Sequence, residues 1–525
     1  MPTFNLLTEP WIPVIRDDGV LEEVNLRDML RRAPELREIR DPLPTVEFGL
    51  YRLLTALVLD IFRLEDTRSL GELLEAGAFD AAVLERYFAQ WGERFDLFHP
   101  QYPFLQYAGM EEKEDKPLAG LLPPIPSGTG VNHFYHQAEE DFAVSPAAAA
   151  RLLTLVAPFM TAGGAGLSPS INGAPPWYVL IRGNTLFETL CLNCCTLPLQ
   201  QAVEDAPPAW RDDRPPREGR ATEASLLEAL TWRPRRIRLL SGPAGQCALT
   251  GHETPVLVRT MKFTAGASCD FAWQDPAIPY RYGNKGPLPL RPQEGREIWR
   301  DTGPLAMLRH GDFESKEGKV RFERPTLVSQ FEQLLDGDIL PSRARLQLAV
   351  YGMRTDMKMK VFEWQAARLA LPAALVQRKR LAEEAQRGME RADSVAYHLG
   401  QAIKRLAPRE GKGNKQALET LIAESRRVYW ADLHGAYEQL LSELNAVPHD
   451  EATIDTELAA CRTHWDAAVQ RIAHNVLKDA INDLDTNGAM LKRQVQARSN
   501  FNKNIWALFH PKDADTTSQE GGSHD

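Results

Sequence analysis

The chain has 525 residues, 43% of them hydrophobic and 25% charged, values that exclude disordered and fibrous proteins. Its 61 Lys and Arg against 71 Asp and Glu give a net charge of −10, which excludes a general nucleic-acid coat protein. Any DNA or RNA contact therefore needs local basic patches. The length predicts one large domain and at least one smaller one.

The first residues and the cysteine content indicate a cytoplasmic protein with reduced thiols. Residues 1–14 lack a basic start and are interrupted by Pro10, Trp11 and Pro13, unlike a signal peptide. No uninterrupted run of about 20 apolar residues predicts a membrane span, so we expect no membrane partner. Six cysteines in a chain of this length are too few for a disulfide framework.

Residues 1–360 are interrupted by Pro and Gly and predict mixed α/β structure. Residues 46–62 have apolar side chains at three- and four-residue spacing, which predicts a helix. The runs 177–181 and 346–351 have the length of strands and contain β-branched or aromatic residues. We therefore expect helices and strands to alternate in this part of the chain.

From residue 361 onward the sequence is rich in Ala, Leu, Glu, Arg and Lys and predicts helices. Gly388 predicts a break between the first two of them. Amphipathic helices are expected at 362–386, 390–408, 414–445 and 451–483, with a further one at 488–509. Short connections favour an antiparallel bundle. The predicted fold is a mixed α/β (α+β) domain over 1–360, an antiparallel four-helix bundle over 361–512 and a disordered tail over 513–525.

The sequence contains no complete catalytic or phosphate-binding motif: G-x-x-x-x-G-K-(S/T), G-x-S-x-G and H-E-x-x-H are all absent. Cys191, Cys194 and Cys195 lie in an apolar helical stretch, which favours core packing over zinc binding. His133 and His136 lie close together, but no carboxylate or cysteine motif completes a metal site around them. We therefore expect no metal, no cofactor and no enzymatic activity.

A cluster of arginines follows Trp232: Arg233, Arg235, Arg236 and Arg238. In a strand, Arg236 and Arg238 would share one face while Arg235 would point to the other. Guanidinium groups suit phosphate oxygens, which favours a nucleic-acid contact. Solvated charges that protect a sheet edge from aggregation are an equally good interpretation.

A glycine-rich segment contains Gly163, Gly164 and Gly166 and precedes a predicted strand. Glycines let a backbone approach another surface closely and offer free N–H donors. The same residues are compatible with a flexible turn. Lys262 lies between short apolar runs and is uninformative by itself.

Three motifs follow one another along the first 200 residues. Residues 5–14 read N-L-L-T-E-P-W-I-P-V, and residues 99–106 read H-P-Q-Y-P-F-L-Q. Residues 182–183, 192–193 and 196–198 read R-G, L-N and T-L-P. In order and spacing these motifs resemble CasA, the large subunit of the type I-E CRISPR surveillance complex Cascade. The resemblance spans nearly the whole chain and agrees with a mixed domain followed by a helical bundle.

The resemblance implies a non-catalytic subunit of an RNA-guided antiviral complex. Such a subunit lies beside the 5′ end of the CRISPR guide RNA and contacts the other Cascade subunits. It recognises the protospacer-adjacent motif in double-stranded target DNA, helps to open the duplex and helps to recruit a helicase-nuclease. In guided complexes, protein reads the adjacent motif and base pairing reads the remaining sequence.

The resemblance also assigns the residues that would read the adjacent motif. Lys262 precedes Phe-Thr, as does the family's motif-reading lysine, which enters the minor groove. Acceptors on the base edges are degenerate there, which suits a reader that tolerates several motifs. Gly163, Gly164 and Gly166 resemble the family's glycine loop, whose small residues would admit the edge of the groove.

Two further segments are assigned by resemblance. Val131 and Asn132 resemble the Val-Asn pair of the guide-proximal loop. The family's wedge hairpin usually carries a glutamine, whereas the residues at this place are Arg354, Thr355, Asp356, Met357 and Lys358. Met357 could insert between base pairs as an apolar wedge. Some members have clustered cysteines that look like a zinc site. The corresponding region of this chain contains only Cys247, so we expect no zinc.

Two other classes of function stay open from the sequence. The chain could be a scaffold subunit that only docks protein partners, and duplex binding that ignores the adjacent motif would favour that class. It could also be an uncharacterised metal- or thiol-dependent hydrolase that uses His133, His136 or Cys194. Metal analysis and activity screening would identify such an enzyme.

Overall fold

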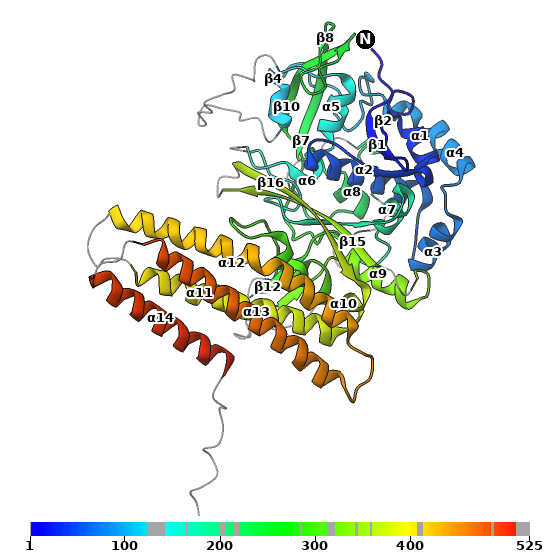
Figure 1. The fold of residues 1–525 in the computed structure, drawn as a ribbon. Coiled ribbons are helices and arrows are strands. Elements are labelled where there is room, and N and C mark those ends of the chain that lie inside the picture. The colour runs from blue at the N-terminus through cyan, green and yellow to red at the C-terminus, as the bar shows by residue number, and fades with distance from the viewer. Residues whose placement is uncertain are drawn as a thin grey trace, which may run out of the picture. The chain divides into compact units, whose positions relative to one another are not determined.

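The computed structural model forms two compact units, which are labelled by element in Figure 1. The N-terminal unit contains Met1–Ile298 and Pro304–Ala370, and the helical unit contains Trp299–Gly303 and Leu371–Asp525. Residues 361–370, which we expected in the C-terminal domain, thus lie in the N-terminal unit. The residues described are 2–122, 142–163, 166–199, 203, 206–214, 220–283, 286–309, 311, 321–341, 345–356, 360–406, 413–484 and 488–510.

The N-terminal unit begins with a three-stranded antiparallel sheet and a long buried helix. Its strands pair in the order β2-β1-β3. Helix α2 (Pro44–Phe62), predicted over 46–62, starts with Pro at its first position and ends at Arg63 in the left-handed conformation. It is buried on almost every side, as an apolar core helix must be. The other elements of this region are β1 (Ile12–Arg16), β2 (Leu21–Val24), α1 (Leu26–Arg31), η1 (Ala33–Glu35), β3 (Leu36–Ile39), α3 (Thr67–Ala76), α4 (Ala81–Trp91) and η2 (Gly92–Phe95).

Two further three-stranded antiparallel sheets position the candidate site. The first has the order β4-β10-β7 and contains β4 (Asp115–Pro117), β10 (Leu257–Ala265) and β7 (Arg235–Gly242). The second has the order β16-β15-β5 and contains β16 (Val361–Pro372), β15 (Arg345–Thr355) and β5 (Tyr178–Arg182). The strands predicted at 177–181 and 346–351 are confirmed as β5 and the first half of β15.

Short elements connect these sheets. They are η3 (Leu118–Leu121), α5 (Pro146–Leu153), α6 (Val156–Phe159), α7 (Leu186–Leu192), β6 (Arg220–Ala221), α8 (Leu226–Leu230), β8 (Gly245–Gln246), β9 (Glu253–Thr254), β11 (Ser268–Cys269), β12 (Tyr280–Gly283), β13 (Gly286–Pro289), η4 (Ile298–Asp301), η5 (Gly303–Met307), β14 (Arg321–Glu323) and α9 (Thr326–Asp336). Together with the sheets they form the mixed α/β part that the sequence predicts.

Buried charges connect distant segments of the N-terminal unit. Arg52 of α2 donates to Asp275 at 2.6 Å, and both side chains are almost fully buried. Asn172 donates to the same carboxylate at 3.1 Å, and Arg52 also donates to the carbonyl oxygen of Leu230 at 3.2 Å. Because both charged groups have hydrogen-bonding partners, this pair does not carry the cost of an isolated charge.

Glu38 of β3 forms a second buried charge cluster with three arginines. Its carboxylate accepts from Arg40 at 2.7 Å, from Arg182 of β5 at 2.6 Å and from Arg368 of β16 at 2.8 Å. Burial opposes ionisation of Glu38, but the guanidinium groups of Arg368 and Arg40 outweigh it and hold its pKa below the usual value. One carboxylate thus ties three segments of the unit together.

The helical unit contains α10 (Ala373–Gln377), α11 (Lys379–Lys404), α12 (Gly413–Ala446), α13 (Ile454–Asn482) and α14 (Gly488–Phe509). Helix α11 packs against each of the other three long helices. Ion pairs of Arg380 with Asp455 and of Arg391 with Asp466 show that α11 and α13 run in the same direction. The predicted C-terminal helical region is confirmed, with helices close to three of the predicted ranges.

The prediction of a helix over 362–386 is wrong in its first half. Residues 361–372 form β16, whose side chains alternate between partly buried and exposed along the strand. Ala, Leu and Arg favour a helix locally, but pairing with β15 decides the conformation of this segment.

The predicted break at Gly388 is also wrong, because α11 runs through it. The carbonyl oxygen of Gly388 accepts a hydrogen bond from Trp465 Nε1 at 2.8 Å. A Cβ atom at this position would lie 3.0 Å from the same nitrogen. The glycine therefore admits the indole ring of α13 and does not end the helix.

A short segment of the chain before α9 belongs to the helical unit. Trp299 packs against Tyr437 and Trp430 of α12, with ring centroids 5.3 and 6.0 Å apart. Arg300 lies 3.5 Å above the Trp430 ring, and Thr302 shares a 2.6 Å hydrogen bond with Tyr437. Aromatic packing of this kind stabilises a core beyond its buried area.

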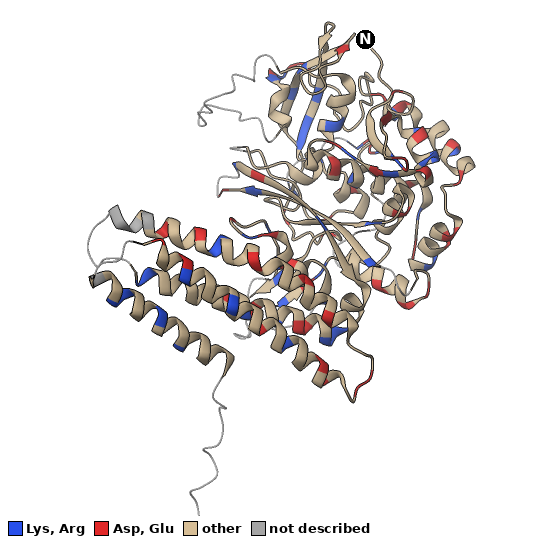
Figure 2. Ribbon diagram, viewed as in Figure 1, with Lys and Arg blue, Asp and Glu red and all other residues tan. Residues whose placement is uncertain are grey.

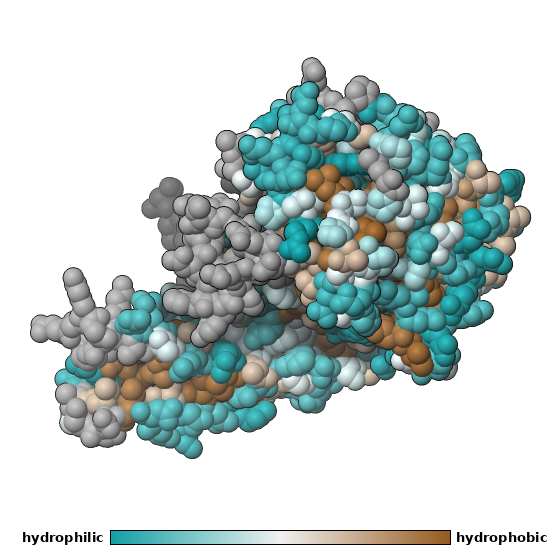
Figure 3. All heavy atoms as spheres, turned by 90° about the horizontal axis from the view of Figure 1, so that it is seen from above, coloured by the Kyte–Doolittle hydropathy of each residue, from teal (hydrophilic) through white to brown (hydrophobic). Residues whose placement is uncertain are grey.

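The surface of the helical unit carries both apolar and basic side chains. Figure 3 shows brown residues between teal ones on the helices, and the exposed large apolar residues here are Tyr397, Val428, Leu491, Val495 and Trp506. Helix α14 contains Lys492, Arg493, Arg498 and Lys503 but no Asp or Glu, as Figure 2 shows by its blue-only pattern. Among the described residues, no helix is long and apolar enough to cross a membrane.

Candidate nucleic-acid interface

The sheet β4-β10-β7 places two cations side by side. Lys262 of β10 lies opposite Arg238 of β7 on one side and Asp115 of β4 on the other. Burial alternates along β7: Arg236 and Arg238 are partly exposed, and Ile237 between them is buried. The segment thus forms a strand, and Arg236 and Arg238 share one of its faces, as expected for that conformation. Figure 2 shows the blue segments on these strands.

The ammonium group of Lys262 is held by two oxygen atoms. Its Nζ donates to the carbonyl oxygen of Lys113 at 2.5 Å and lies 2.6 Å from Asp115 Oδ1. The side chain of Lys262 is 17% exposed, whereas that of Asp115 is 53% exposed. The lysine is thus held in one direction, and an incoming acceptor would compete for it with the exposed carboxylate of Asp115.

Arg235 differs from its neighbours because it is only 2% exposed. Its guanidinium donates to the carbonyl oxygens of Thr161, at 2.7 Å, and of Ser168. Burial lowers the pKa of Arg235 to about 10. Arg235 therefore fastens the segment 161–168 to the sheet, which corrects the prediction that it faces phosphate.

The glycine-rich segment lies beside this buried arginine. A Cβ on Gly163 would lie 3.1 Å from Leu167 Cδ1 and 3.6 Å from the Arg235 guanidinium. Gly166 has a φ of 80°, which favours glycine. Arg235 pairs with Ala265, three residues beyond Lys262 on β10, so the Arg235 side chain and Lys262 lie on opposite faces of the sheet.

The remaining arginines of the cluster are engaged with neighbours in the N-terminal unit. Arg238 Nη1 donates to the carbonyl oxygen of His99 at 2.9 Å, and burial lowers its pKa. Arg233 pairs with Asp212 at 3.1 Å and lies 4.5 Å above the ring of Tyr107. Arg236 lies 6.0 Å from the same ring. The four arginines thus do not form one open patch.

The predicted wedge lies at the end of the β15–β16 hairpin. Arg354 pairs with Glu363 at 3.2 Å and with Glu294 at 3.3 Å, and its guanidinium lies over the Phe362 ring. Thr355 ends β15, and Asp356 N donates to Lys360 O at 3.0 Å across the turn. These contacts fix the stem of the hairpin.

Sequence reasoning missed two exposed aromatic residues on this hairpin. Phe362 is 60% exposed and Trp364 is 39% exposed, on the same face of β16. They were not identified from the sequence because their segment was predicted to be helical. The alternation V-F-E-W-Q at 361–365 is the signal that could have identified the strand.

Several predicted site residues lie outside the described part of the chain: Val131, Asn132, His133, His136, Gly164, Met357 and Lys358. The predicted disordered tail at 513–525 also lies outside it. The structure therefore places neither the guide-proximal pair nor the two residues at the tip of the wedge.

The three cysteines of the apolar stretch are buried, as predicted for core residues. Burial raises the pKa of Cys191 and Cys194 and raises that of Cys195 to about 12. A thiol with so high a pKa is a poor nucleophile at neutral pH. Within the described ranges, no group of three or more His, Cys, Asp and Glu could hold a metal ion.

Comparisons with known proteins show what this chain resembles. Residues 5–476 match the family described as CRISPR-associated protein Cse1. A curated relative from Thermus thermophilus, described as CRISPR-associated protein CasA/Cse1, is 30% identical and covers 96% of this chain and 98% of its own length.

Solved structures have the same fold. Cse1 from Acidimicrobium ferrooxidans gives a TM-score of 0.74 at 24% identity, covering 97% of this chain and 98% of that one. A chain described as part of a CRISPR RNA-guided surveillance complex gives a TM-score of 0.72 at 21% identity. The match covers 95% of this chain and 100% of that one.

Proposed function

We propose a role in DNA recognition for this chain, which belongs to the CRISPR-associated Cse1 family, also called CasA. It acts in the cytoplasm as the non-catalytic large subunit of an RNA-guided Cascade complex. There it recognises the protospacer-adjacent motif in double-stranded target DNA, helps to open the duplex and helps to recruit a helicase-nuclease. The similarity to a chain of a CRISPR RNA-guided surveillance complex supports assembly with guide RNA and other subunits.

The observation that carries this proposal is the fixed position of Lys262 on β10. Its ammonium already donates to two oxygen atoms, so the direction of its donors is set before DNA binds. In the minor groove, base edges present mainly acceptors, which a positioned ammonium can meet. Gly163 and Gly166 lie in the loop segment that Arg235 of β7 holds, and neither has a side chain that would obstruct an approaching surface.

Opening of the duplex is assigned to the β15–β16 hairpin. A hairpin that enters between base pairs must keep its shape while it pays the cost of unstacking. The ion pairs of Arg354 with Glu363 and Glu294 brace the stem. Thr355, Asp356, Met357 and Lys358 form the tip in this proposal, and Val131 and Asn132 contact the 5′ end of the guide RNA.

The test uses the complex assembled with its sister subunits and a guide RNA. Lys262→Ala should weaken binding of motif-bearing duplex by about 5- to 150-fold, the range for losing about 1–3 kcal/mol of base contact, with assembly unchanged. Lys116→Ala is the matched control, because Lys116 lies on the neighbouring strand β4 with its side chain 50% exposed. Randomised flanking sequence shows whether the preference for a motif is lost.

Two outcomes would contradict the proposal. Wild-type complex that binds duplex equally with and without an adjacent motif would favour a scaffold that only docks protein partners. Turnover of a substrate by the purified chain, abolished by Cys194→Ser, would favour a thiol-dependent hydrolase.

A further inference from the structure

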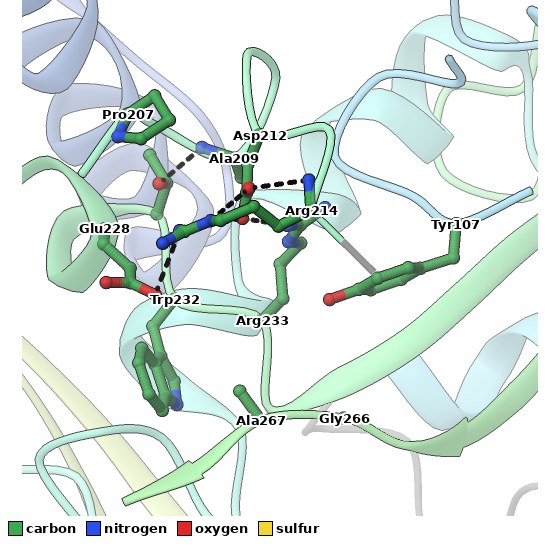
Figure 4. A pocket seen from close by; sticks show the side chains of 11 residues that line it. Tyr107, Pro207, Ala209, Asp212, Arg214, Glu228, Trp232, Arg233, Gly266 and Ala267 are labelled. Atoms are coloured by element: carbon green, nitrogen blue, oxygen red, sulfur yellow. Dashed lines mark hydrogen bonds and ion pairs between the residues drawn. The ribbon is translucent and has the colours of Figure 1, made fainter. Parts of the chain in front are cut away.

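A polar cavity of about 260 Å³ lies beside the sheet that carries Lys262. Its walls come from the segment 101–108, from the segment 209–214 and from Arg94 and Arg233. A second cavity of about 40 Å³, drawn in Figure 4, shares Tyr107, Ala209, Asp212, Arg214 and Arg233 with it. All these residues belong to the N-terminal unit.

Hydrogen bonds attach one wall of the cavity to strand β7. Tyr107 N donates to the carbonyl oxygen of Ile237 at 2.9 Å, and Leu239 N donates to Gln106 Oε1 at 2.7 Å. This wall is therefore one strand spacing from β7, and β7 is one spacing from β10. At about 4.8 Å per spacing, the wall lies roughly 10 Å from the strand of Lys262.

The walls combine aromatic rings with guanidinium planes. Arg94 lies 3.6 Å above the ring of Tyr102, and Arg233 lies 4.5 Å above that of Tyr107. Trp210 adds a third aromatic side chain to the lining. Flat π systems stack on such surfaces, and aromatic stacking contributes about 1–3 kcal/mol per nucleic-acid base.

The charges of the cavity are largely compensated. Arg94 is paired with Asp213 at 3.0 Å, and Arg233 and Arg214 are both paired with Asp212. A free phosphate would have to compete with these carboxylates, whereas an uncharged ring would not. The chemistry therefore favours a flat, neutral ligand over a phosphate group.

Polar groups for the edge of such a ring are present. Within the described residues, the hydroxyl of Tyr107 and the side-chain amide of Gln101 have no hydrogen-bond partner. Figure 4 shows the hydroxyl of Tyr107 directed toward the side chain of Arg233. A volume of about 260 Å³ corresponds to roughly nine waters, which leaves room for one nucleobase.

We propose that this cavity binds a single unpaired nucleobase, stacked against Tyr107 and Tyr102. The inference rests on the proposed function, because the nucleic acid held at Lys262 brings the base within reach. About 10 Å corresponds to one or two nucleotides of extended strand. The base comes from the guide RNA or from an opened strand of target DNA, and the two sources share the recognition chemistry.

Photo-crosslinking in the assembled complex tests the inference. 5-Iodouracil is placed singly along the guide RNA in one arm and along each strand of the target DNA in the other. We expect crosslinks to a peptide that contains Tyr102 or Tyr107, and the arm that gives them identifies the source. No such crosslink in either arm, while binding still depends on the adjacent motif, overturns this inference and leaves the proposed function intact.

Variants give a second readout. Tyr107→Ala should lower the crosslink yield at least tenfold, while Tyr107→Phe, which keeps the ring, and Tyr397→Ala, which removes an exposed ring of α11, should not. If Tyr107→Ala does not assemble, Gln101→Trp, an exposed position whose larger side chain would fill the cavity, should abolish the crosslink. Unchanged yield in these cavity variants overturns the inference.

Discussion

The two units hold their buried charges in different ways. In the N-terminal unit, Arg52 and Asp275 are 223 residues apart in sequence and form a pair with almost no exposed surface. In the helical unit, the carboxylate of Glu384 pairs with Arg391 and Arg462 from the helices α11 and α13, and both arginines are more exposed than Arg52. The N-terminal unit thus contains an ion pair from distant segments with almost no exposed surface, whereas the Glu384 cluster joins two helices through more exposed arginines.

The largest effect is expected where a buried pair loses one partner. Asp275→Ala leaves the guanidinium of Arg52 buried without a counter-charge and should cost about 3–5 kcal/mol of unfolding free energy. Denaturant unfolding followed by tryptophan fluorescence measures it. Asp18→Ala, which removes one partner of an exposed pair with Arg16, is the control and should change the midpoint little. Equal effects of the two variants would contradict the expected cost of leaving Arg52 buried without a counter-charge.

Glu384→Gln should have a smaller effect, and its size should depend on pH. Burial raises the pKa of Glu384, but Arg462 and Arg391 outweigh it and lower the pKa overall. The stabilisation is therefore complete above the unfolded pKa of about 4.3 and is lost as the pH falls through the lower folded value.

At pH 7 we expect Glu384→Gln to cost about 1.5–3 kcal/mol, the range for hydrogen bonds to charged groups. The difference in unfolding free energy between the variant and the unsubstituted chain should decrease below about pH 4. Glu438→Gln is the control, since Glu438 is 71% exposed and faces only His434. A difference in unfolding free energy that stays constant from pH 7 to pH 3 would contradict a lowered pKa of Glu384 in the folded chain.

Gly388→Ala distinguishes a helix break from a packing contact. An alanine in the middle of a helix is normally favoured over glycine by about 1 kcal/mol. Here its Cβ would crowd Trp465 and Leu440, and overpacking typically costs about 1–3 kcal/mol. We expect net destabilisation of about 1 kcal/mol in thermal unfolding. Net stabilisation would show that the indole ring moves away freely.

An effect as small as that of Gly388→Ala is expected for Trp465→Phe. The variant keeps an aromatic ring but removes the hydrogen bond from Nε1 to the carbonyl oxygen of Gly388. The loss should be about 0.5–1.5 kcal/mol. The double variant with Gly388→Ala should be less destabilised than the sum of the two single variants, because both act on the same contact. Additive effects would show that the two substitutions act on separate contacts.

The helical unit could be predicted largely from the sequence. A period of 3.6 residues gives the ranges 414–445 and 488–509, which agree with α12 and α14 within one residue at each end. Only the start of strand β16 carries a strand pattern, at 361–365; its residues Ala366 to Leu371 are good helix formers, and pairing with β15 makes them extended. Local propensity was overridden by tertiary structure.

The candidate site was predictable only in part. Lys262 was identified by resemblance, since a lone lysine in a strand has no distinctive sequence signal. Arg235 was misjudged because an arginine in a basic run reads as a phosphate ligand, whereas carbonyl oxygens of a remote segment bury it. The cavity between 101–108 and 209–214 has no periodic pattern, and only the folded chain brings these segments together.

The cluster around Glu38 has a consequence for how the chain is made. Its carboxylate is 4% exposed, and one of its three arginines stands 330 positions later in the sequence. While the ribosome is still translating, β3 exists for most of synthesis before Arg368 has emerged from the exit tunnel. Before that point the carboxylate of Glu38 can pair with Arg40 and Arg182, and the late strand β16 completes the cluster with its third arginine.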